Sequence, residues 1–309
     1  MTQLTLLAIR GYVGGRKVHG PVPSELGKLT KLQRLGISKN DVTGTFPTEL
    51  FLLTELKSFD ALETLNSGTL PTQFGLLSSL NYVMVAETQV TGPLPTELGN
   101  LKLLSWLILR GNDFTGSVPS EIGAMESLQE MSFSGSSLTS SLPTELEQMD
   151  RLYRLDFADN KLTGSVPAFN SSSITSIRLS GNSFSGPIPS SLGLLTTLEK
   201  LDLAYNLLTS SIPPELGNLS SLRGACLQNN FLNGSLPVQL VGLQMLETWN
   251  SANNELSGEV PIQYSLQWPN ITAFNVSGNE LLVCSNPTGF CQLNNESLCC
   301  PPESINGIC

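Results

Sequence analysis

Few residues in this chain have the types and spacing that catalysis requires. The sequence contains one histidine, His19, in a glycine-rich stretch without a nearby serine, cysteine or carboxylate motif. A mechanism that needs two imidazoles is therefore excluded, and we expect His19 to be a solvated loop residue. The run Gly14-Gly15-Arg16-Lys17 lacks the GxxxxGK[ST] spacing of a phosphate-binding loop.

Carboxylate pairs give no stronger signal of catalysis. Asp156 and Asp159 resemble the two acids of a hydrolase in spacing only. We expect Asp156, like Asp202, to be a solvated residue of a repeated strand. The sequence therefore predicts a protein that is not an enzyme and that has no cofactor and no metal.

Cysteines concentrate at the C-terminus. Five of the six cysteines lie in the C-terminal tail. The other, Cys226, is expected at an exposed strand position. Four of the tail cysteines could form two bridges in three connectivities, leaving one tail thiol over. A tetrahedral zinc site is the alternative, but no CxxC pair occurs and the single histidine is distant. The disulfide candidates are Cys284, Cys291, Cys299, Cys300 and Cys309.

Composition excludes several classes of protein. Of 309 residues, 40% are apolar and 14% are charged, which is unlike a disordered acidic chain. The formal net charge of −10 argues against nucleic acid as a partner. No window has the ~18 uninterrupted apolar residues of a transmembrane span. The first residues, MTQLTLLAIRGYVGG, lack the charged segment and cleavage site of a secretory signal.

A repeated phrase organises the chain. Eleven prolines from Pro23 to Pro261 are spaced by 24 residues in nine of ten intervals and by 22 in the other. Around them runs LxxLxLxxNxLTGxIPxxLGxLxx, which we count in twelve repeats. The LxxLxL part has the alternation of a short strand, and neighbouring repeats pair these strands in parallel. No single repeat can bury its leucines alone, so stacking forms the core.

The other positions of the phrase have separate roles. Asparagine at the ninth position bonds the backbone where the chain turns inward, and glycine at the thirteenth permits a left-handed backbone. Thr64, Thr88 and Ser136 replace the asparagine in three repeats, so we expect weaker bonding there. The first repeat carries about four extra residues before Pro23, expected as a loop, and the seventh loses two after Pro167.

This phrase resembles the plant-type 24-residue leucine-rich repeat of receptor-kinase ectodomains and polygalacturonase-inhibiting proteins. The resemblance implies an α/β repeat solenoid, a superhelix of about 12 units with a parallel concave sheet and short convex helical turns. It divides the chain into a solenoid at 1–283 and a cysteine-rich C-terminal cap at 284–309. Family members carry an N-terminal cap with a cysteine pair, absent here, so we expect this sequence to lack its N-terminus and signal peptide. The alternative is that another chain covers this edge.

Sequons and the cysteine cap favour the secretory route. We therefore expect an extracellular or cell-surface protein, and a cytoplasmic location is the alternative because the sequence has no signal peptide. The glycosylation candidates are Asn170, Asn218, Asn233, Asn270, Asn275 and Asn295.

The concave face is the expected binding surface. Its repeat positions carry nine basic and nine acidic residues, so the charge of −10 resides elsewhere. Tyr82 and Trp106 occupy the same position in adjacent repeats, and Trp249 is expected in the core. Tyr, Trp and Arg dominate binding hot spots. The predicted ligand-binding residues are Arg34, Tyr82, Met84, Trp106, Ile108, Arg110, Tyr153, Arg154 and Arg178.

These features predict a non-enzymatic recognition module that binds a peptide or protein ligand, receptor-like or receptor-associated. A receptor kinase or a secreted enzyme is the expected partner. The alternatives are an inhibitor of cell-wall-degrading enzymes and a structural wall or matrix protein that binds polysaccharide.

Overall fold

The computed structural model describes residues 3–11 and 15–283. The chain divides into two compact units, Met1–Leu152 and Tyr153–Cys309, and each contains six of the twelve repeats. The predicted cap at 284–309, with its five cysteines and Asn295, lies outside the described residues and stays a prediction.

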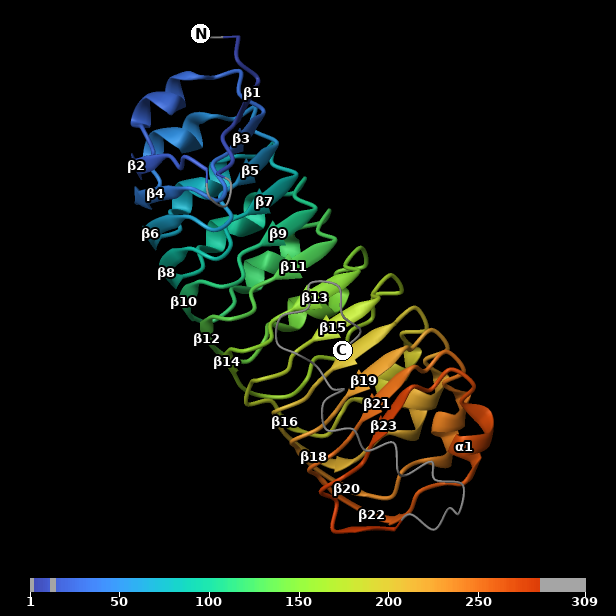
Figure 1. Ribbon diagram of the computed structural model, residues 1–309. Helices are drawn as coiled ribbons and strands as arrows, with labels where there is room; N and C mark the ends of the chain where they lie inside the picture. The colour runs from blue at the N-terminus through green and yellow to red at the C-terminus, as the bar shows by residue number, and fades with distance from the viewer. Residues whose placement is uncertain (1–2, 12–14, 284–309) are drawn as a thin grey trace. The chain divides into compact units, whose positions relative to one another are not determined.

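Each repeat of the N-terminal unit contributes a three-residue strand to a parallel principal sheet (Figure 1). The middle residue of each strand points inward, and Leu35, Phe59, Val83 and Leu107 are at most 2% exposed. The two residues on either side point outward, because successive side chains of a strand alternate between faces. The strands, in order, are β1 (Leu6–Ala8), β3 (Arg34–Gly36), β5 (Ser58–Asp60), β7 (Tyr82–Met84), β9 (Trp106–Ile108) and β11 (Glu130–Ser132).

A second set of parallel strands follows the principal sheet along its flank. These strands are β2 (His19–Pro21), β4 (Asp41–Gly44), β6 (Leu65–Thr69), β8 (Gln89–Pro93), β10 (Asp113–Gly116) and β12 (Ser137–Ser140). Left-handed glycines end two of them, Gly44 at φ 73° in β4 and Gly116 at φ 76° in β10. We call this set the flank sheet.

Short 3-10 helices complete the repeats and confirm the predicted helical turns. Each begins directly after a repeat proline in extended conformation, such as Pro47 at φ −65°. Glu49 lies in the first turn, where the partial positive charge of the backbone N–H groups favours a carboxylate. The helices are η1 (Ser24–Lys28), η2 (Thr48–Leu52), η3 (Thr72–Leu76), η4 (Thr96–Asn100), η5 (Ser120–Ala124) and η6 (Thr144–Gln148).

The C-terminal unit repeats the same plan. No helix lies between β14 and β15, in agreement with the shortened seventh repeat. The principal strands are β13 (Arg154–Asp156), β15 (Ser176–Arg178), β17 (Lys200–Asp202), β19 (Gly224–Cys226), β21 (Thr248–Asn250) and β23 (Ala273–Asn275). The flank strands are β14 (Lys161–Leu162), β16 (Ser185–Gly186), β18 (Leu207–Ser211), β20 (Phe231–Gly234), β22 (Glu255–Glu259) and β24 (Leu281–Val283), and the helices are η7 (Ser190–Leu194), η8 (Pro214–Asn218), η9 (Val238–Gly242) and α1 (Gln263–Gln267).

Aromatic side chains fill the core of both units. In the N-terminal unit, the Phe59 ring centroid lies 5.3 Å from that of Phe46 and 5.8 Å from that of Phe74. Trp249 is 1% exposed, which confirms it as a core residue, and its Nε1–H donates to Ser251 Oγ at 3.0 Å. The polar end of this buried aromatic side chain thus has a hydrogen-bond partner inside the protein.

The first repeat differs from expectation. His19 does not lie in a loop, because His19–Pro21 forms β2 and pairs with β4 in the register His19↔Asp41. The Asp41 N–H donates to Val18 O at 3.0 Å, and the Val18 N–H donates to Asn40 Oδ1 at 3.0 Å. The extra residues come before this strand in the sequence. From His19 on, backbone pairing with β4 gives the first repeat the same strand register as the other repeats.

Buried asparagines tie neighbouring repeats together, as Asn206 does in the C-terminal unit. Asn206 Nδ2 donates to the carbonyls of Leu179, Leu203 and Ala204 at 3.0–3.1 Å, and its Oδ1 accepts from Phe184 N–H at 3.0 Å. Because these backbone groups are shielded from water, they would lose hydrogen-bond partners without the amide.

The substituted repeats bond less. Ser136 Oγ donates to Asn112 O at 3.1 Å, and Thr64 Oγ1 donates to Asn66 Oδ1 at 2.8 Å. These hydroxyls do not reproduce the set of backbone bonds that Asn206 makes, which agrees with the weaker bonding that the sequence predicts.

Replacing Asn206 with alanine is expected to lower the free energy of unfolding by about 2–4 kcal/mol, because each buried group left unsatisfied costs about 1–3 kcal/mol. Ser136→Ala is the matched control and is expected to cost about 1 kcal/mol or less. Urea unfolding followed by circular dichroism measures both. Equal losses for the two variants would show that the asparagines do not dominate the stability of the turn.

Candidate ligand-binding surface

Two neighbouring strands of the N-terminal unit present an aromatic and apolar surface. β7 and β9 pair in parallel with the register Tyr82↔Trp106 and Met84↔Ile108. All four side chains are half-buried and point outward, on either side of inward-pointing Val83 and Leu107. We call these four residues, Tyr82, Met84, Trp106 and Ile108, the aromatic patch.

The two rings of the patch contact each other in a tilted arrangement. Their centroids are 6.4 Å apart and their planes meet at 50°. The Tyr82 hydroxyl points along its own strand and donates to Met84 Sδ at 3.5 Å. The prediction that Tyr82 and Trp106 lie side by side is confirmed, because strands of one sheet are spaced by about 4.8 Å.

Burial and negative charge both act on the Tyr82 phenol. Desolvation raises its pKa to about 12, and the carboxylates of Asp60 and Glu130 add to the shift. These acids lie on the neighbouring strands β5 and β11, in register with Met84 and Trp106 respectively. The aromatic patch is therefore bordered by a carboxylate on each side.

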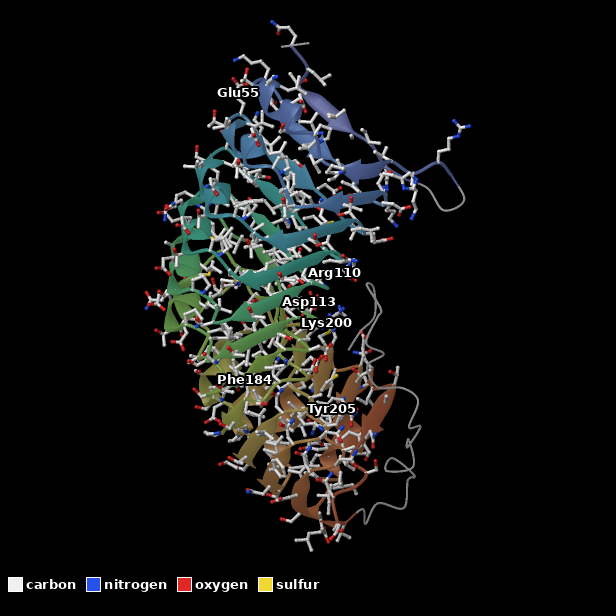
Figure 2. The ribbon with its side chains drawn as sticks, turned by 90° about the vertical axis from the view of Figure 1, so that its left-hand side faces the viewer. Glu55, Arg110, Asp113, Phe184, Lys200 and Tyr205 are labelled. Carbon is white, nitrogen blue, oxygen red and sulfur yellow. The ribbon has the colours of Figure 1, made fainter. Side chains whose placement is uncertain are left out.

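Two predicted arginines of this unit differ in their surroundings. Arg110, just after β9 (Figure 2), forms an ion pair with Glu87 in which Nη1 lies 2.7 Å from Oε1. Arg34 is exposed on β3 and lies in the same row as Tyr82, separated from it by Ser58. Arg34 is thus about two strand spacings, or ~10 Å, from the patch.

The remaining predicted residues belong to the C-terminal unit. Tyr153 and Arg154 are half-buried at the start of β13. Arg178 bridges two carboxylates across neighbouring strands: its Nη1 lies 3.2 Å from Asp156 Oδ2 and its Nε lies 3.9 Å from Asp202 Oδ2. Arg178 therefore contributes to the fold of this unit, and 29% of its side chain is exposed.

The expectation that Asp156 and Asp202 are solvated is wrong. Their side chains are 5% and 9% exposed. Each Oδ1 accepts from a backbone N–H two residues on, Ala158 at 3.2 Å and Ala204 at 3.3 Å, and Asp202 Oδ2 also accepts from Ser180 Oγ at 2.7 Å. These bonds and Arg178 replace the water that the carboxylates lose.

The expectation of an exposed Cys226 is also wrong. Cys226 lies on β19 and is fully buried. Its neighbours in register are Asp202 on β17 and Asn250 on β21, which are themselves buried. An outward position in the repeat is therefore not always an exposed one.

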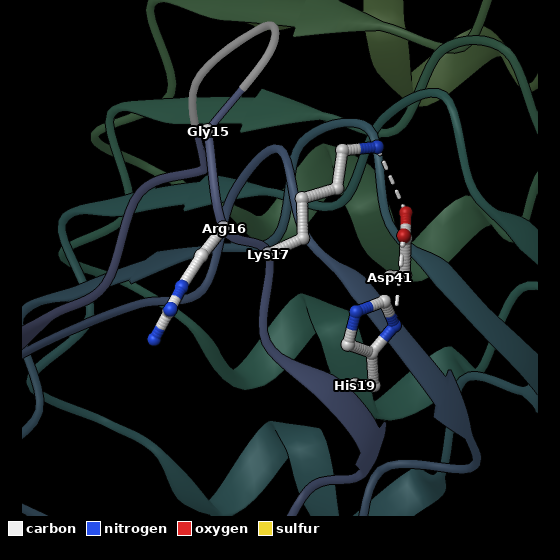
Figure 3. Close-up of a pocket in the computed structure, with 5 residues that line it drawn as sticks. All are labelled: Gly15, Arg16, Lys17, His19 and Asp41. Carbon is white, nitrogen blue, oxygen red and sulfur yellow. Dashed lines mark hydrogen bonds and ion pairs between the residues drawn. The ribbon is translucent and has the colours of Figure 1, made fainter.

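The single histidine lines an open pocket of the N-terminal unit (Figure 3). Asp41 Oδ1 lies 2.8 Å from Lys17 Nζ, and Asp41 Oδ2 lies 3.6 Å from His19 Nδ1. The Arg16 side chain points away from Asp41 in this view. The His19 side chain is 72% exposed, so solvent surrounds the group that general-base catalysis would use.

Five of the predicted sequons fall on described residues, all in the C-terminal unit. Asn170, Asn218, Asn233 and Asn270 are exposed, as an acceptor of an N-linked glycan must be. Asn275 is half-buried on β23, and its Oδ1 accepts from the N–H and hydroxyl of Ser277.

In the part of the chain that the structure describes, no three His, Cys, Asp or Glu side chains cluster as a metal site would require. Within the same residues, no helix has the length and apolar character needed to cross a membrane.

Comparison with known proteins agrees with the repeated strand and 3-10 helix plan of the structure. The family profile named Leucine Rich Repeat matches residues 173–195 and 197–219. Among curated proteins, no sequence matches the chain. The chain is a leucine-rich-repeat protein, and its structure is similar to the ectodomains of plant receptor kinases.

Three solved structures illustrate the similarity. The plant peptide hormone receptor RGFR1, solved with RGF2, is 28% identical with a TM-score of 0.77, over 87% of this chain and 46% of the receptor chain. The Arabidopsis receptor kinase HAESA, solved with the peptide hormone IDA and the co-receptor SERK1, is 27% identical with a TM-score of 0.78, over 92% and 51%. The ectodomain of the Arabidopsis membrane receptor kinase GASSHO1/SCHENGEN3, in complex with CASPARIAN STRIP INTEGRITY FACTOR 2, is 25% identical with a TM-score of 0.65, over 90% and 38%. The chain spans about half the length of these receptor chains or less.

Tyrosine titration tests the electrostatics of the aromatic patch. The Tyr82 pKa of about 12 lies above the ordinary value of 10.0. Because Tyr82 ionises less readily in the folded chain than in the unfolded chain, the folded state tolerates neutral Tyr82 best. The contribution of Tyr82 to the free energy of unfolding is therefore full below pH 10 and is lost as the pH rises through 12. Asp60→Asn should lower the Tyr82 pKa, but by less than the whole shift, because burial is the largest cause.

The measurement is an NMR titration of the tyrosine ring carbons, with Tyr82→Phe to assign the signal. A Tyr82 pKa near 10.0, or one unmoved by Asp60→Asn, would contradict the described surroundings of the phenol.

Replacing Arg178 with alanine is expected to lower the free energy of unfolding by about 2–4 kcal/mol, because it leaves two buried carboxylates without their cation. Arg34→Ala removes an exposed arginine and is expected to change stability by ~0.5 kcal/mol or less. Urea unfolding of both variants provides the comparison. If Arg178→Ala were as stable as Arg34→Ala, the bridge would not hold the C-terminal unit together.

Proposed function

We propose that this chain is a non-enzymatic recognition module that binds an extended peptide on the outward, concave face of its principal sheet. The observation that carries the proposal is the aromatic patch. Tyr82 and Trp106 are only half-buried although their backbone is fixed in a parallel sheet. Rigid, accessible aromatic side chains of this kind are typical of binding hot spots, since little conformational entropy is lost on binding.

The solved relatives support a peptide as the ligand. The receptors RGFR1 and HAESA are described in complex with RGF2 and with the peptide hormone IDA. HAESA is also described with a co-receptor, SERK1. For this chain we propose a receptor-like or receptor-associated role, with a peptide as ligand and a receptor kinase as partner.

An extracellular location accompanies this role. The described sequons include four exposed asparagines, and the GASSHO1/SCHENGEN3 relative is described as an ectodomain. We further propose that residues 284–309 form a disulfide-locked cap over the last repeat, since the final apolar face of a solenoid needs cover.

A random dodecapeptide library displayed on phage tests the function. The full chain is immobilised, and the affinity of the enriched peptides is measured by calorimetry. The double variant Tyr82→Ala/Trp106→Ala should weaken binding at least tenfold, because each such anchor contributes about 1 kcal/mol or more. Thermal stability should change little, because both side chains point away from the core.

Leu103→Ala is the matched control, because Leu103 is a large apolar residue of the same unit that is 58% exposed and lies outside the principal strands. It should bind the enriched peptides as the wild type does. Peptides that bind the double variant with unchanged affinity would exclude the patch as the site, and a library with no enriched peptide would contradict peptide binding.

A further inference from the structure

We infer that Asn233 carries an N-linked glycan whose first sugar packs against the exposed ring of Phe231 and stabilises the C-terminal unit. The inference rests on the extracellular location proposed above and does not depend on peptide binding at the aromatic patch. Its basis is an exposed aromatic ring, an accessible amide and polar neighbours that lie on one surface of β20.

Phe231 and Asn233 lie two residues apart on β20 and point away from the core. Both side chains are exposed, and Leu232 between them is fully buried. Successive side chains of a strand alternate between faces, so the phenyl ring and the amide share one face, with Cα atoms about 6.6 Å apart. A sugar attached to the amide is therefore within reach of the ring.

Asn233 is placed as an acceptor of a glycan must be. Asn233, Gly234 and Ser235 form a sequon. Within residues 3–11 and 15–283, the Asn233 side chain forms no hydrogen bond. β20 ends at Gly234, which has a left-handed backbone at φ 72°. The amide thus lies at a turn on the surface, where a modifying enzyme has access.

The modification replaces one bond by another without oxidation or reduction. Asn233 Nδ2 forms a bond to the anomeric carbon of an oligosaccharide that is linked to a lipid diphosphate. The bond from this carbon to the phosphate oxygen breaks, and the lipid diphosphate leaves. The amide proton goes to a base of the transferring enzyme.

Phe231 belongs to an uncovered apolar surface. It is 48% exposed, and among the described side chains no other ring contacts it. Leu207 on the neighbouring strand β18 is 45% exposed (Figure 1). The register Thr209↔Phe231 places Leu207 diagonally from Phe231, with Cα atoms about 8 Å apart. Neighbouring exposed apolar side chains mark a surface that another group covers.

A sugar fits this surface chemically. One face of a pyranose ring presents C–H bonds with partial positive charge, and the face of a phenyl ring is negative, so the two flat surfaces attract each other. Ser211 on β18 and Glu255 on β22 are in register with Asn233, and both are exposed. Their hydroxyl and carboxylate are suitable hydrogen-bond partners for the hydroxyls at the edge of the sugar.

The other sequons lack this arrangement. Trp268 precedes Asn270 by two residues, but it is 4% exposed and stacks on Tyr264 with ring centroids 4.2 Å apart. Asn270 Nδ2, the atom that would carry the glycan, donates to Gln244 O at 3.1 Å. At the remaining four sequons, no aromatic residue lies two positions earlier in the sequence. An accessible ring is thus specific to Asn233.

Peptide mapping tests the modification. The full chain is secreted from insect cells behind a signal peptide and digested with trypsin and with a protease that cleaves after glutamate. Cleavage after Arg223 and Glu247 releases residues 224–247, which contain Asn233 and no other sequon. Mass spectrometry should find most of these fragments glycosylated. An unmodified Asn233 would overturn the inference.

Thermal unfolding of the secreted protein tests the packing. Asn233→Gln should lower the Tm by about 2–4 °C, the shift expected for the loss of one such contact in a unit of this size. Ser235→Ala removes the sequon but keeps Asn233, and it should lower the Tm equally. In a Phe231→Ser background, Asn233→Gln should change the Tm by about 1 °C or less, because no ring remains for the sugar to cover.

Val238→Ser is the matched control, because Val238 is a 46%-exposed apolar residue of η9 in the same unit. In that background, Asn233→Gln should lower the Tm as it does in the wild type. If Asn233→Gln lowered the Tm equally with and without Phe231, or did not lower it at all, the packing would be excluded. These results would leave peptide binding in place, and a phage library with no enriched peptide would contradict the proposed function without altering them.

Discussion

The structure depends on hydrogen bonds between buried asparagine side chains and the backbone of neighbouring repeats. Where a principal strand ends, the chain turns toward the interior of the protein. The backbone carbonyls and N–H groups of this turn are buried, and no neighbouring strand offers them hydrogen-bond partners. Asn230 donates to Leu203 O, Leu227 O and Gln228 O, and its Oδ1 accepts from the Leu208 N–H. One side chain thus satisfies four backbone groups and fixes the spacing of two repeats.

The same constraint creates the proposed binding surface. Because the repeats within each unit are held to their neighbours, the three-residue strands keep their register, and equivalent outward side chains lie side by side. Tyr82 and Trp106 meet only because Val83 and Leu107 are anchored in the core beneath them. The solenoid therefore presents side chains on a backbone already ordered, and a ligand need not order it.

The repeat plan could be read from the sequence because it depends on local and periodic features. The 24-residue spacing, the prolines before the 3-10 helices and the inward Trp249 all follow from a single repeat and its copies. The pairing of Tyr82 with Trp106 was predictable for the same reason, since equivalent positions in adjacent repeats must be neighbours.

Features that depend on particular side chains of several repeats were not predictable. Asp156 and Asp202 are buried because Arg178 lies between them and backbone N–H groups approach each carboxylate. The burial of Cys226 and the unpaired hydroxyl of Ser132 likewise depend on their surroundings in three dimensions. A signal was present for the aspartates: an Asp or Asn at this strand position can accept from the N–H two residues on, as Asn250 does from Ala252.

Tryptophan fluorescence tests most directly whether a peptide binds over Trp106. Of the three tryptophans, Trp249 and Trp268 are 1% and 4% exposed, whereas Trp106 is half-buried. Titration with a library-selected peptide lacking tryptophan should shift the emission to shorter wavelength in the wild type. The shift should be absent in Trp106→Phe. A peptide that binds, by calorimetry, without any change in the Trp106 emission would contradict the account.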